Sequence, residues 1–555
     1  MTTSSLRWTL GVLASLAAAW AGTSTHPGAS SEGTAESMIV QAADAATAAA
    51  AVGAVGGTVT HDLAVINAVG ARLTPSQGRA LAARPGVARV YSDRALRSNG
   101  HAPTTYYPAL SEASRLHAEG ITGSGVTVAV LDTGYYPFAS LNENGKTDRV
   151  LAQYDAILDS LRIVKGARKN IPLATDENGH GTHVTSIILS SGRDVAGAYA
   201  GIAPGANLVS VKAFDAAGNG TYMDVIRGIG WVVANRDAYR IRVLNCSFGA
   251  APRSHYWDDP LNQAVMAAWK AGIVVVASAG NTGPQPMTVG VPGNVPYVIT
   301  VGAVTDSSTP DNAGDDRLAT FSSTGPTVEG FVKPDLLALG GHNLGQMSPD
   351  AWLARQHPEL RVLVDRSTEP YFAMSGTSQA AAVASGVVAL MLQASPDLGP
   401  DDVKCRLMAG ARPALASDNS LAYSVFQQGA GQINAYAAVH GDIVGCANQG
   451  LNVAKDLAGI EHYGGRANQQ PGNGAYYLMG LAGYQWNGAA GGTDGYIWTD
   501  GYVWSDGYIW TDGYVWSDAF IWSEGYTWAS ATTLSGQRAW SLAEPTSTDV
   551  WVDEK

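Results

Sequence analysis

Val126-Thr127-Val128-Ala129-Val130-Leu131 is a continuous run of apolar and β-branched residues that ends at Asp132. Continuous rather than alternating apolarity is typical of a strand that is buried on both faces of a parallel sheet. Four further runs have the same character, at 208–214, 241–246, 273–277 and 297–304, and two helical patterns, at 222–235 and 261–272, lie among them. This alternation predicts an α/β fold of three layers with a mainly parallel central sheet.

Polar residues follow three of these runs. Asp132, Ser247 and Asn281 each stand at or just beyond the carboxyl end of a predicted strand. In α/β sheets such ends gather at one edge, where ligand sites form. We therefore expect these three side chains to share one site.

Two further strings place chemically active residues in Gly- and Thr-rich turns: Gly179-His180-Gly181-Thr182-His183 and Ser375-Gly376-Thr377-Ser378. The small and apolar stretch 379–392 predicts a buried helix with Ser378 at its N-terminus, where partial positive charge suits a developing anion. Acyl transfer needs a nucleophile, a base and a group that orients the base. Ser378, His180 and Asp132 are candidates for these three roles.

The three strings, in the order Asp, His, Ser, resemble the subtilisin family of serine peptidases (subtilases) over roughly residues 120–440. The resemblance implies that Ser378 is the nucleophile, His180 the general base and Asp132 the group that orients the base. It also implies that Asn281, at the end of Ala277-Ser278-Ala279-Gly280-Asn281, forms an oxyanion hole together with the backbone N–H of Ser378.

Each of these residues also has an ordinary structural interpretation. Ser378 could be a helix N-cap, and Asp132 and Asn281 could be turn residues. His180 and His183 could bind a metal, although a spacing of three without matching ligands elsewhere is a weak signal. The presence of all the motifs in one chain favours the catalytic interpretation.

The resemblance assigns further residues to the walls of a substrate cleft. Ser247-Phe248-Gly249 and the segment with Ala279 and Gly280 match strands that flank the primary specificity pocket, and Gly290 is expected near its base. Extended substrates pair with such edges through backbone hydrogen bonds. None of these positions is acidic, so we expect apolar or aromatic side chains to be preferred before the scissile bond.

The serine string departs from the family pattern, in which Met follows the serine and a Pro comes three residues later. Gln379 and Ala382 occupy these two positions here. A Pro in the first turn of a helix is tolerated but not needed. We expect the change to alter how the helix begins without the loss of a catalytic group.

The N-terminal region predicts export and later activation. Arg7, the short apolar stretch 8–20 and the string Ala19-Trp20-Ala21 are typical of a signal peptide with its cleavage site. Residues 37–97 combine strand-like stretches at 38–40, 64–69 and 87–91 with helix-like stretches at 42–55 and 75–84. This resembles the inhibitory propeptide of subtilases, with an ordinary N-terminal domain as the alternative.

Six tandem hexapeptides fill residues 493–528: TDGYIW, TDGYVW, SDGYIW, TDGYVW, SDAFIW and SEGYTW. Turn-like Thr-Asp-Gly alternates with strand-like aromatic and β-branched residues, which predicts short stacked strands. A row of Trp side chains could contact carbohydrate or another surface. The plainer alternative is a low-complexity repeat with no partner of its own.

Composition excludes some classes of function. The net charge is −13, and residues 481–555 hold ten acidic and two basic residues, so no basic cluster favours nucleic acid. No apolar run after the N-terminus is long enough to predict a membrane span. Cys405 and Cys446 could pair in an oxidising compartment, while Cys246 is expected to be a buried apolar side chain. We expect no cofactor and no metal site, and a structural calcium is implied only by the family resemblance.

The predicted organisation is a signal peptide (1–21), an inhibitory propeptide (37–97), a peptidase domain (104–445), a linker (446–482), a hexapeptide-repeat segment (483–528) and a tail (529–555). We expect a secreted serine endopeptidase, with association at the cell surface as an alternative, that is made as a self-processing zymogen and acts on proteins or peptides. Two other classes stay open: a non-catalytic binding protein on a peptidase scaffold, and a surface adhesin built around the repeats.

Overall fold

The computed structural model describes residues 35–93, 103–142, 148–163, 175–306, 316–363, 369–416, 420–481, 484–489, 520–521 and 545–548. The chain divides into two compact units between Ser98 and Asn99. The predicted signal peptide and most of the hexapeptides lie outside the described residues, so both stay predictions.

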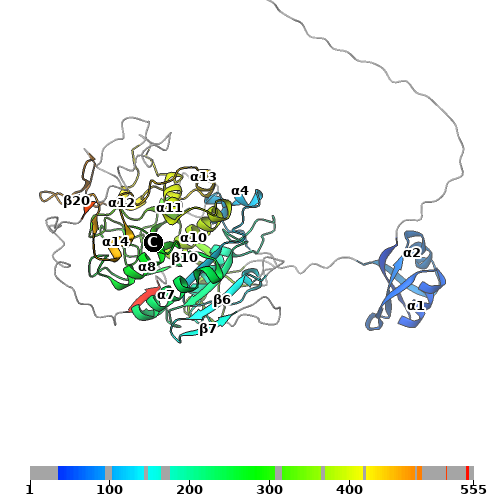
Figure 1. The fold of residues 1–555 in the computed structure, drawn as a ribbon. Helices are drawn as coiled ribbons and strands as arrows, with labels where there is room; N and C mark the ends of the chain where they lie inside the picture. Colours follow the sequence, from blue (N-terminus) through cyan, green and yellow to red (C-terminus); the bar gives the residue numbers. More distant parts are fainter. Residues whose placement is uncertain are drawn as a thin grey trace, which may run out of the picture. The chain divides into compact units, whose positions relative to one another are not determined.

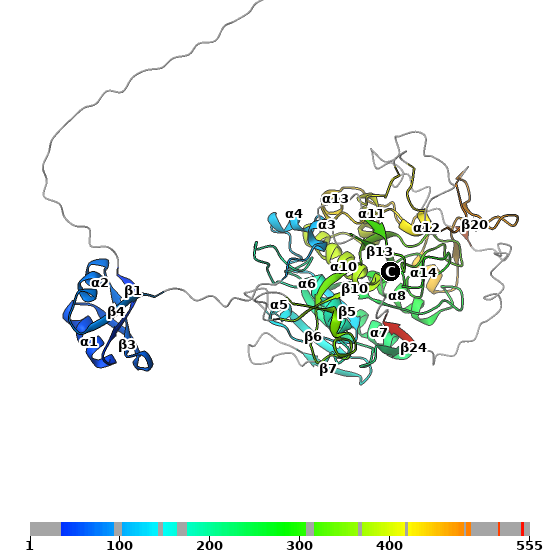
Figure 2. The same ribbon diagram turned by 180° about the vertical axis from the view of Figure 1, so that it is seen from behind.

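The smaller unit is a four-stranded antiparallel sheet, in the order β2-β3-β1-β4, with two helices (Figure 1 and Figure 2). Asp44 and Thr74 cap the two helices with their side chains, because each accepts a backbone N–H from the first turn. Apolar residues of the sheet and both helices form its core. Its elements are β1 (Glu36–Ala42), α1 (Ala45–Ala54), β2 (Thr58–Leu63), η1 (Ala64–Ile66), β3 (Ala68–Leu73), α2 (Pro75–Ala82) and β4 (Val87–Ser92).

One predicted strand of this unit is a turn in part. Residues 64–66 form the 3-10 helix η1, and only 68 onward continue as a strand. Asp62 Oδ1 accepts the N–H of Ala64 (3.0 Å), and Asn67 adopts the left-handed conformation, so the chain reverses between β2 and β3. The strand β2 was not predicted, since its residues are largely polar and exposed.

The larger unit is built on a nine-stranded sheet in the order β14-β13-β12-β10-β5-β8-β6-β7, with β15 beside β13. Its central strands run parallel, and β7 and β14 are antiparallel to their neighbours. The strands are β5 (Thr127–Asp132), β6 (Val150–Asp155), β7 (Ser160–Ile163), β8 (Asn207–Lys212), β10 (Ile241–Cys246), β12 (Val274–Ser278), β13 (Ile299–Thr305), β14 (Arg317–Leu318) and β15 (Leu336–Leu339).

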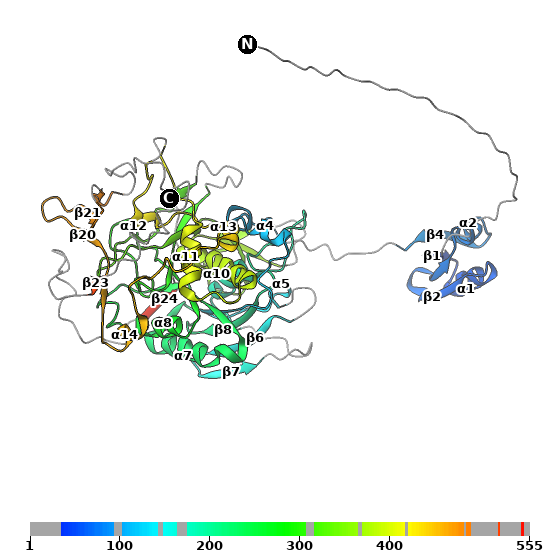
Figure 3. The ribbon, with the colours of Figure 1, turned by 45° about the horizontal axis from the view of Figure 1, so that its top comes forward.

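Helices cover both faces of this sheet. One layer contains α6 (His180–Leu189) and α10 (Thr377–Ala394), which pack on each other, and the other contains α7 (Tyr222–Tyr239) and α8 (Pro260–Lys270) (Figure 2, and Figure 3 for α10, α7 and α8). The three-layer α/β fold predicted from the apolar runs is therefore confirmed. Smaller helices surround it: α3 (Tyr107–Leu110), α4 (Ala113–Ala118), α5 (Ala139–Asn142), α9 (Trp352–Gln356), η2 (Pro358–Leu360), α11 (Pro400–Ala409), α12 (Val425–Gln428), α13 (Ala435–His440) and α14 (Val453–Leu457).

The helix α10 is buried almost all round because its residues are small or apolar. Among the described helices, α10 is long and apolar enough to cross a membrane. However, 89% of it is buried inside the domain. It is the central helix of the core, in contact with the strands of the sheet.

Residues 446–481 of the predicted linker, and residues 484–489 at the start of the predicted repeat segment, pack on the larger unit. Cys446 forms a disulfide with Cys405 of α11. The buried carboxylate of Asp456, in α14, accepts hydrogen bonds from the hydroxyls of Tyr256 (2.6 Å) and Tyr297 (2.9 Å). Trp486 is fully buried in a second apolar cluster with Phe426. A linker would not bury the carboxylate of Asp456 in this way.

Short strands complete the larger unit. Two come from the far C-terminal region: β23 (Phe520–Ile521), within the fifth hexapeptide, pairs with β19 (Tyr463–Gly464), and β24 (Pro545–Thr548) pairs with β9 (Asn219–Thr221) and β11 (Phe248–Gly249). The others are β16 (Asn343–Gln346), β17 (Arg361–Val362), β18 (Tyr371–Met374), β20 (Ala467–Gln469), β21 (Tyr476–Leu478) and β22 (Gln485–Trp486).

Candidate active site

Asp132 is the last residue of β5, and its side chain is almost fully buried. Its Oδ1 lies 2.8 Å from Nδ1 of His180 and also accepts the backbone N–H of Thr133 (2.7 Å). An ionised carboxylate can only accept, so Nδ1 carries the proton and Nε2 is the basic nitrogen of the ring. The structure therefore brings together two of the residues that the sequence singled out.

His180 is the first residue of α6, after a left-handed Gly179 (φ 106°). A Cβ on Gly179 would lie 2.6 Å from Cγ of Met347, so a side chain would both strain the backbone and displace its neighbour. This glycine sets the point at which the helix begins and, with it, the direction of the imidazole.

Asp176 is a buried residue that the sequence reasoning missed. Its Oδ1 accepts from Thr133 Oγ1 (2.8 Å) and from the N–H of Gly179 (2.7 Å), and its Oδ2 accepts the N–H of Thr182 (2.8 Å). It thereby ties the end of β5 to the first turn of α6. The available signal was an acid four residues before His180, where negative charge favours a helix N-terminus.

Ser378 is the second residue of α10, and Gly376 is the N-cap. Its Oγ donates to the carbonyl oxygen of Ser247 (3.2 Å), and Ser247 Oγ donates to the carbonyl oxygen of Ser378 (3.0 Å). Asn245 Nδ2 donates to Ser247 Oγ (2.9 Å), and Ser385 Oγ donates to Asn245 Oδ1 (2.9 Å). Side-chain bonds thus fasten the start of α10 to the end of β10.

Asn281 lies beside the start of α10. Its Oδ1 accepts both the N–H (2.9 Å) and the hydroxyl (2.9 Å) of Thr377. Since the amide oxygen is held in this way, the Nδ2 donors are on the opposite side of the side chain. The N–H of Ser378 belongs to the first helical turn, whose N–H groups have no partner within the helix.

The six predicted wall residues gather around the same place. Phe248 and Gly249 form β11, directly after Ser247. The N–H of Gly290 donates to the carbonyl of Ala279 (3.0 Å), and the N–H of Gly280 donates to Thr377 Oγ1 (3.1 Å). The structure therefore places these positions next to Ser378 and Asn281.

The two histidines of the motif have different surroundings. His183 is fully buried, with Nε2 hydrogen-bonded to the carbonyl of Phe372 (3.1 Å), and burial lowers the pKa of His183 to about 3. His180 faces Asp132 instead. Among the described residues, no group of three or more His, Cys, Asp or Glu side chains could hold a metal.

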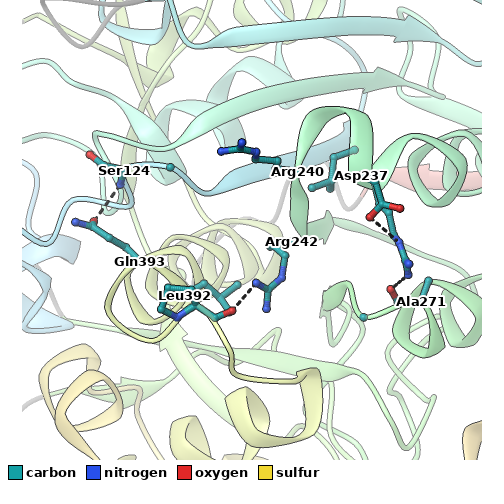
Figure 4. Close-up of a pocket in the computed structure, with 12 residues that line it drawn as sticks. Ser124, Asp237, Arg240, Arg242, Ala271, Leu392 and Gln393 are labelled. Carbon is teal, nitrogen blue, oxygen red and sulfur yellow. Dashed lines mark hydrogen bonds and ion pairs between the residues drawn. The ribbon is translucent and has the colours of Figure 1, made fainter.

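A separate depression of about 500 Å³ lies at the opposite edge of the sheet, near the starts of β5 and β10 (Figure 4). The guanidinium of Arg242 there donates to the carbonyls of Pro396 (2.7 Å) and Leu398 (2.8 Å). Gln393 Oε1 accepts the N–H of Ser124 (3.0 Å) on its rim. These groups stabilise the fold and are not part of the site around Ser378.

Comparisons with known proteins agree with this arrangement. Residues 123–431 match the sequence profile described as "Subtilase family". Serine protease AprX of Bacillus subtilis (strain 168) is 38% identical over 382 residues, 68% of this chain and 80% of that protein. Subtilisin E of the same organism is 30% identical over 392 residues, 69% of this chain and 83% of that protein.

Among solved structures, the crystal structure of fervidolysin from Fervidobacterium pennivorans covers 75% of this chain and 62% of its own, at 23% identity and a TM-score of 0.45. The family match spans more than half of the chain and includes Asp132, His180 and Ser378. The chain therefore belongs to the subtilase family and is a serine-type endopeptidase of the subtilisin kind.

Proposed function

We propose that Asp132, His180 and Ser378 are the catalytic triad of this endopeptidase. The observation that carries the proposal is the buried hydrogen bond between Asp132 Oδ1 and His180 Nδ1 (2.8 Å), at the sheet edge where α10 presents Ser378. The carboxylate holds the imidazole in one tautomer and stabilises its protonated form. Asp176 is a positioning residue, because it ties together the turns that carry the acid and the base.

In the proposed reaction Ser378 Oγ attacks the scissile carbonyl carbon while the hydroxyl proton, here directed to the Ser247 carbonyl, passes to His180 Nε2. Asn281 Nδ2 and the N–H of Ser378 donate to the oxyanion. Collapse breaks the C–N bond, and the leaving amine takes the proton from His180. Water then attacks the acyl-enzyme by the same route and regenerates the serine.

We also propose the wider setting that the sequence predicts. The substrate wall formed by Ser247, Phe248, Gly249, Ala279, Gly280 and Gly290 contains no acid, which supports a preference for apolar or aromatic side chains before the cleaved bond. The small antiparallel unit before residue 98 supports a zymogen, since it directly precedes the family-matched region. Export as a secreted protein rests on the N-terminal sequence, and surface or carbohydrate contact by the repeats stays a prediction.

Hydrolysis of casein and of a chromogenic peptide that ends in Phe tests the triad. We expect Ser378→Ala to lower kcat/KM on the order of 10⁶-fold, Asp132→Asn about 10⁴-fold, and Asn281→Ala about 10²- to 10³-fold, mainly in kcat. Phenylmethylsulfonyl fluoride should inactivate the wild-type protein.

Ser395→Ala is the matched control, because Ser395 is the C-cap at the other end of the same helix. It should keep full activity. Persistent cleavage by purified Ser378→Ala protein would show that the nucleophile has been misassigned. Shortening of the wild-type chain, but not of Ser378→Ala, should accompany zymogen activation.

A further inference from the structure

A strand from the C-terminal region pairs with the predicted substrate wall beside Ser378. β24 (Pro545–Thr548) is the central strand of a three-stranded sheet in the order β11-β24-β9 and is antiparallel to both neighbours. Thr548 pairs with Phe248, Ser547 with both Gly249 and Asn219, Thr546 with Gly220, and Pro545 with Thr221. Figure 2 shows this strand next to α7, which begins directly after β9.

The two flanking strands leave room for a single strand between them. β9 and β11 pair with β24 and not with each other. Adjacent strands lie about 4.8 Å apart, so a strand on each side defines a slot one strand wide. A Cβ on Gly220 would lie 2.7 Å from the carbonyl of Ala213 and from the ring of Phe214, so it would point into the domain and not toward β24. The contacts that the structure gives between β24 and its two neighbours are backbone pairs.

The chain direction of β24 is the direction expected for the part of a substrate that precedes the scissile bond. Its C-terminal residue, Thr548, is opposite Phe248, which directly follows Ser247. The carbonyl of Ser247 accepts the Ser378 hydroxyl. A substrate that pairs with the same edge and delivers its carbonyl to Ser378 must run in this direction, with its N-terminal residues toward β9.

The nucleophile and the base are both covered in this conformation. Ser378 and His180 each have 0% of their surface exposed. An external substrate must reach Ser378 Oγ, so the cleft must open first. β24 pairs with Phe248 and Gly249, which directly follow Ser247, the residue whose carbonyl accepts the Ser378 hydroxyl.

We propose that residues 545–548 of the chain's own C-terminal region bind the substrate groove as an intramolecular competitive ligand. This rests on the proposed function, because it takes the groove beside Ser378 as the substrate groove. The segment reads Pro-Thr-Ser-Thr, without an aromatic or large apolar residue, so backbone pairing supplies the binding. Covalent attachment provides a high effective concentration even for such a weak strand. A better substrate can then displace it.

Thr546→Pro tests the proposal, with Thr546→Val as its matched control. Thr546 is opposite Gly220 of β9 in the middle of this short strand, and Pro at this position removes a backbone N–H from the strand and disfavours its pairing. Val keeps the N–H and the β-branched shape. Neither change touches the residues assigned to catalysis.

The first measurement is hydrogen–deuterium exchange on the full chain that carries Ser378→Ala, which cannot cut itself by the proposed mechanism. The three N–H groups of Thr546, Ser547 and Thr548 should exchange at least about tenfold more slowly than the same groups in an unstructured peptide. The N–H groups of β9 and β11 should be protected with them. Thr546→Pro should remove this protection, and Thr546→Val should keep it. Equal, fast exchange in all three proteins would overturn the proposal.

The second measurement is peptide hydrolysis by the same two variants with Ser378 intact, after mass spectrometry has verified an intact C-terminus. Thr546→Pro should lower KM about threefold or more at unchanged kcat, and Thr546→Val should match the wild type. Equal KM values in active enzymes would overturn the proposal while the proposed function stands. Loss of hydrolysis in every protein, with exchange protection intact, would instead contradict the assignment of the catalytic residues.

Discussion

Gln379, directly after the proposed nucleophile, buries an amide without a hydrogen bond to any described residue. Its side chain is 0% exposed, and neither Nε2 nor Oε1 has a partner among the residues that the structure describes. The nearby Ala382 is also buried and lies in the second turn of α10, six residues after the N-cap. The expectation that a Pro there would stand in the first turn was wrong. In the second turn a Pro would remove the N–H that a helix directs to the carbonyl of Ser378.

Gln379→Met should raise the free energy of unfolding by about 1–3 kcal/mol, because it removes a buried amide without partners at nearly constant volume. Urea unfolding in a Ser378→Ala background measures this without self-digestion. Gln393→Met is the matched control in the same helix. Gln393 Oε1 accepts the N–H groups of Thr122, Gly123 and Ser124, so that change should lower stability instead. A loss of stability in both variants would contradict the interpretation of Gln379.

At the scale of elements, buried polar side chains fasten helices and strands to one another. His183 joins α6 to β18 through the carbonyl of Phe372. Asp335, directly before β15, accepts Nζ of Lys333 (2.6 Å) and Nζ of Lys404 from α11 (3.0 Å), all almost fully buried. These contacts decide how stability responds to pH and to the loss of single charges.

Acid should destabilise the protein through His183. Burial lowers the pKa of His183 to about 3, whereas the unfolded chain has a pKa of about 6.5. Between these values the unfolded chain binds a proton that the folded chain does not, so stability falls as the pH drops below about 6.5 and is complete above it. Urea unfolding measures the unfolding free energy from about pH 4 to pH 8. The slope of this free energy against pH should be shallower for His183→Gln than for the wild type, by up to about 1.4 kcal/mol per pH unit. Identical slopes would exclude a buried neutral imidazole.

The charges around Asp335 should respond unequally to substitution. Asp335→Asn leaves two ammonium groups buried without their carboxylate and should cost about 3–5 kcal/mol of unfolding free energy. Lys333→Met leaves the pair of Asp335 and Lys404 and should cost clearly less. Urea unfolding of both variants measures the difference. Equal costs would mean that the three charges do not act as one buried group.

Several elements were predictable because local sequence and burial agree. The strand β10 has the predicted bounds, and α10 begins at Thr377, next to the predicted start at Ser378. Both elements have continuous runs of small or apolar residues, and such runs indicate an element that is buried on all sides. The polar, exposed strand β2 offered no such signal. At the site, residue types and motif order suggested Asp132, His180 and Ser378. The part played by Asp176 depends on three donors from two separate segments, the turn after β5 and the start of α6, and no local pattern encodes such a convergence.

At the scale of the whole molecule, the larger unit is closed by its own late sequence. The Cys405–Cys446 disulfide, the Asp456 carboxylate and the Trp486 indole hold residues 446–489 on the domain. Pairing of the two cysteines could not be decided from sequence, because their separation in space depends on how α11 packs. The predicted linker fails for a related reason, since its residues contact partners far away in the chain, such as Tyr256, 200 residues before Asp456.

The reactivity of the three cysteines tests whether the disulfide holds residues 446–489 on the domain. Cys246 is fully buried, and burial raises the pKa of its thiol, so the native protein should not react with a thiol reagent such as dithiobis(nitrobenzoate). One thiol should react in urea, and three after reduction. Replacement of both Cys405 and Cys446 by Ser should lower the unfolding free energy by about 2–4 kcal/mol. A native chain with two reactive thiols would contradict the disulfide.

The position of β24 in the chain also has a consequence for timing. Pro545 lies 114 residues after Gly431, where the family match ends. At about 5–20 residues per second, the ribosome needs roughly 6–23 seconds to make that interval. Each new molecule therefore has all the residues of the family-matched region before it has the strand that pairs with β9 and β11. A chain whose translation stops early never obtains that strand.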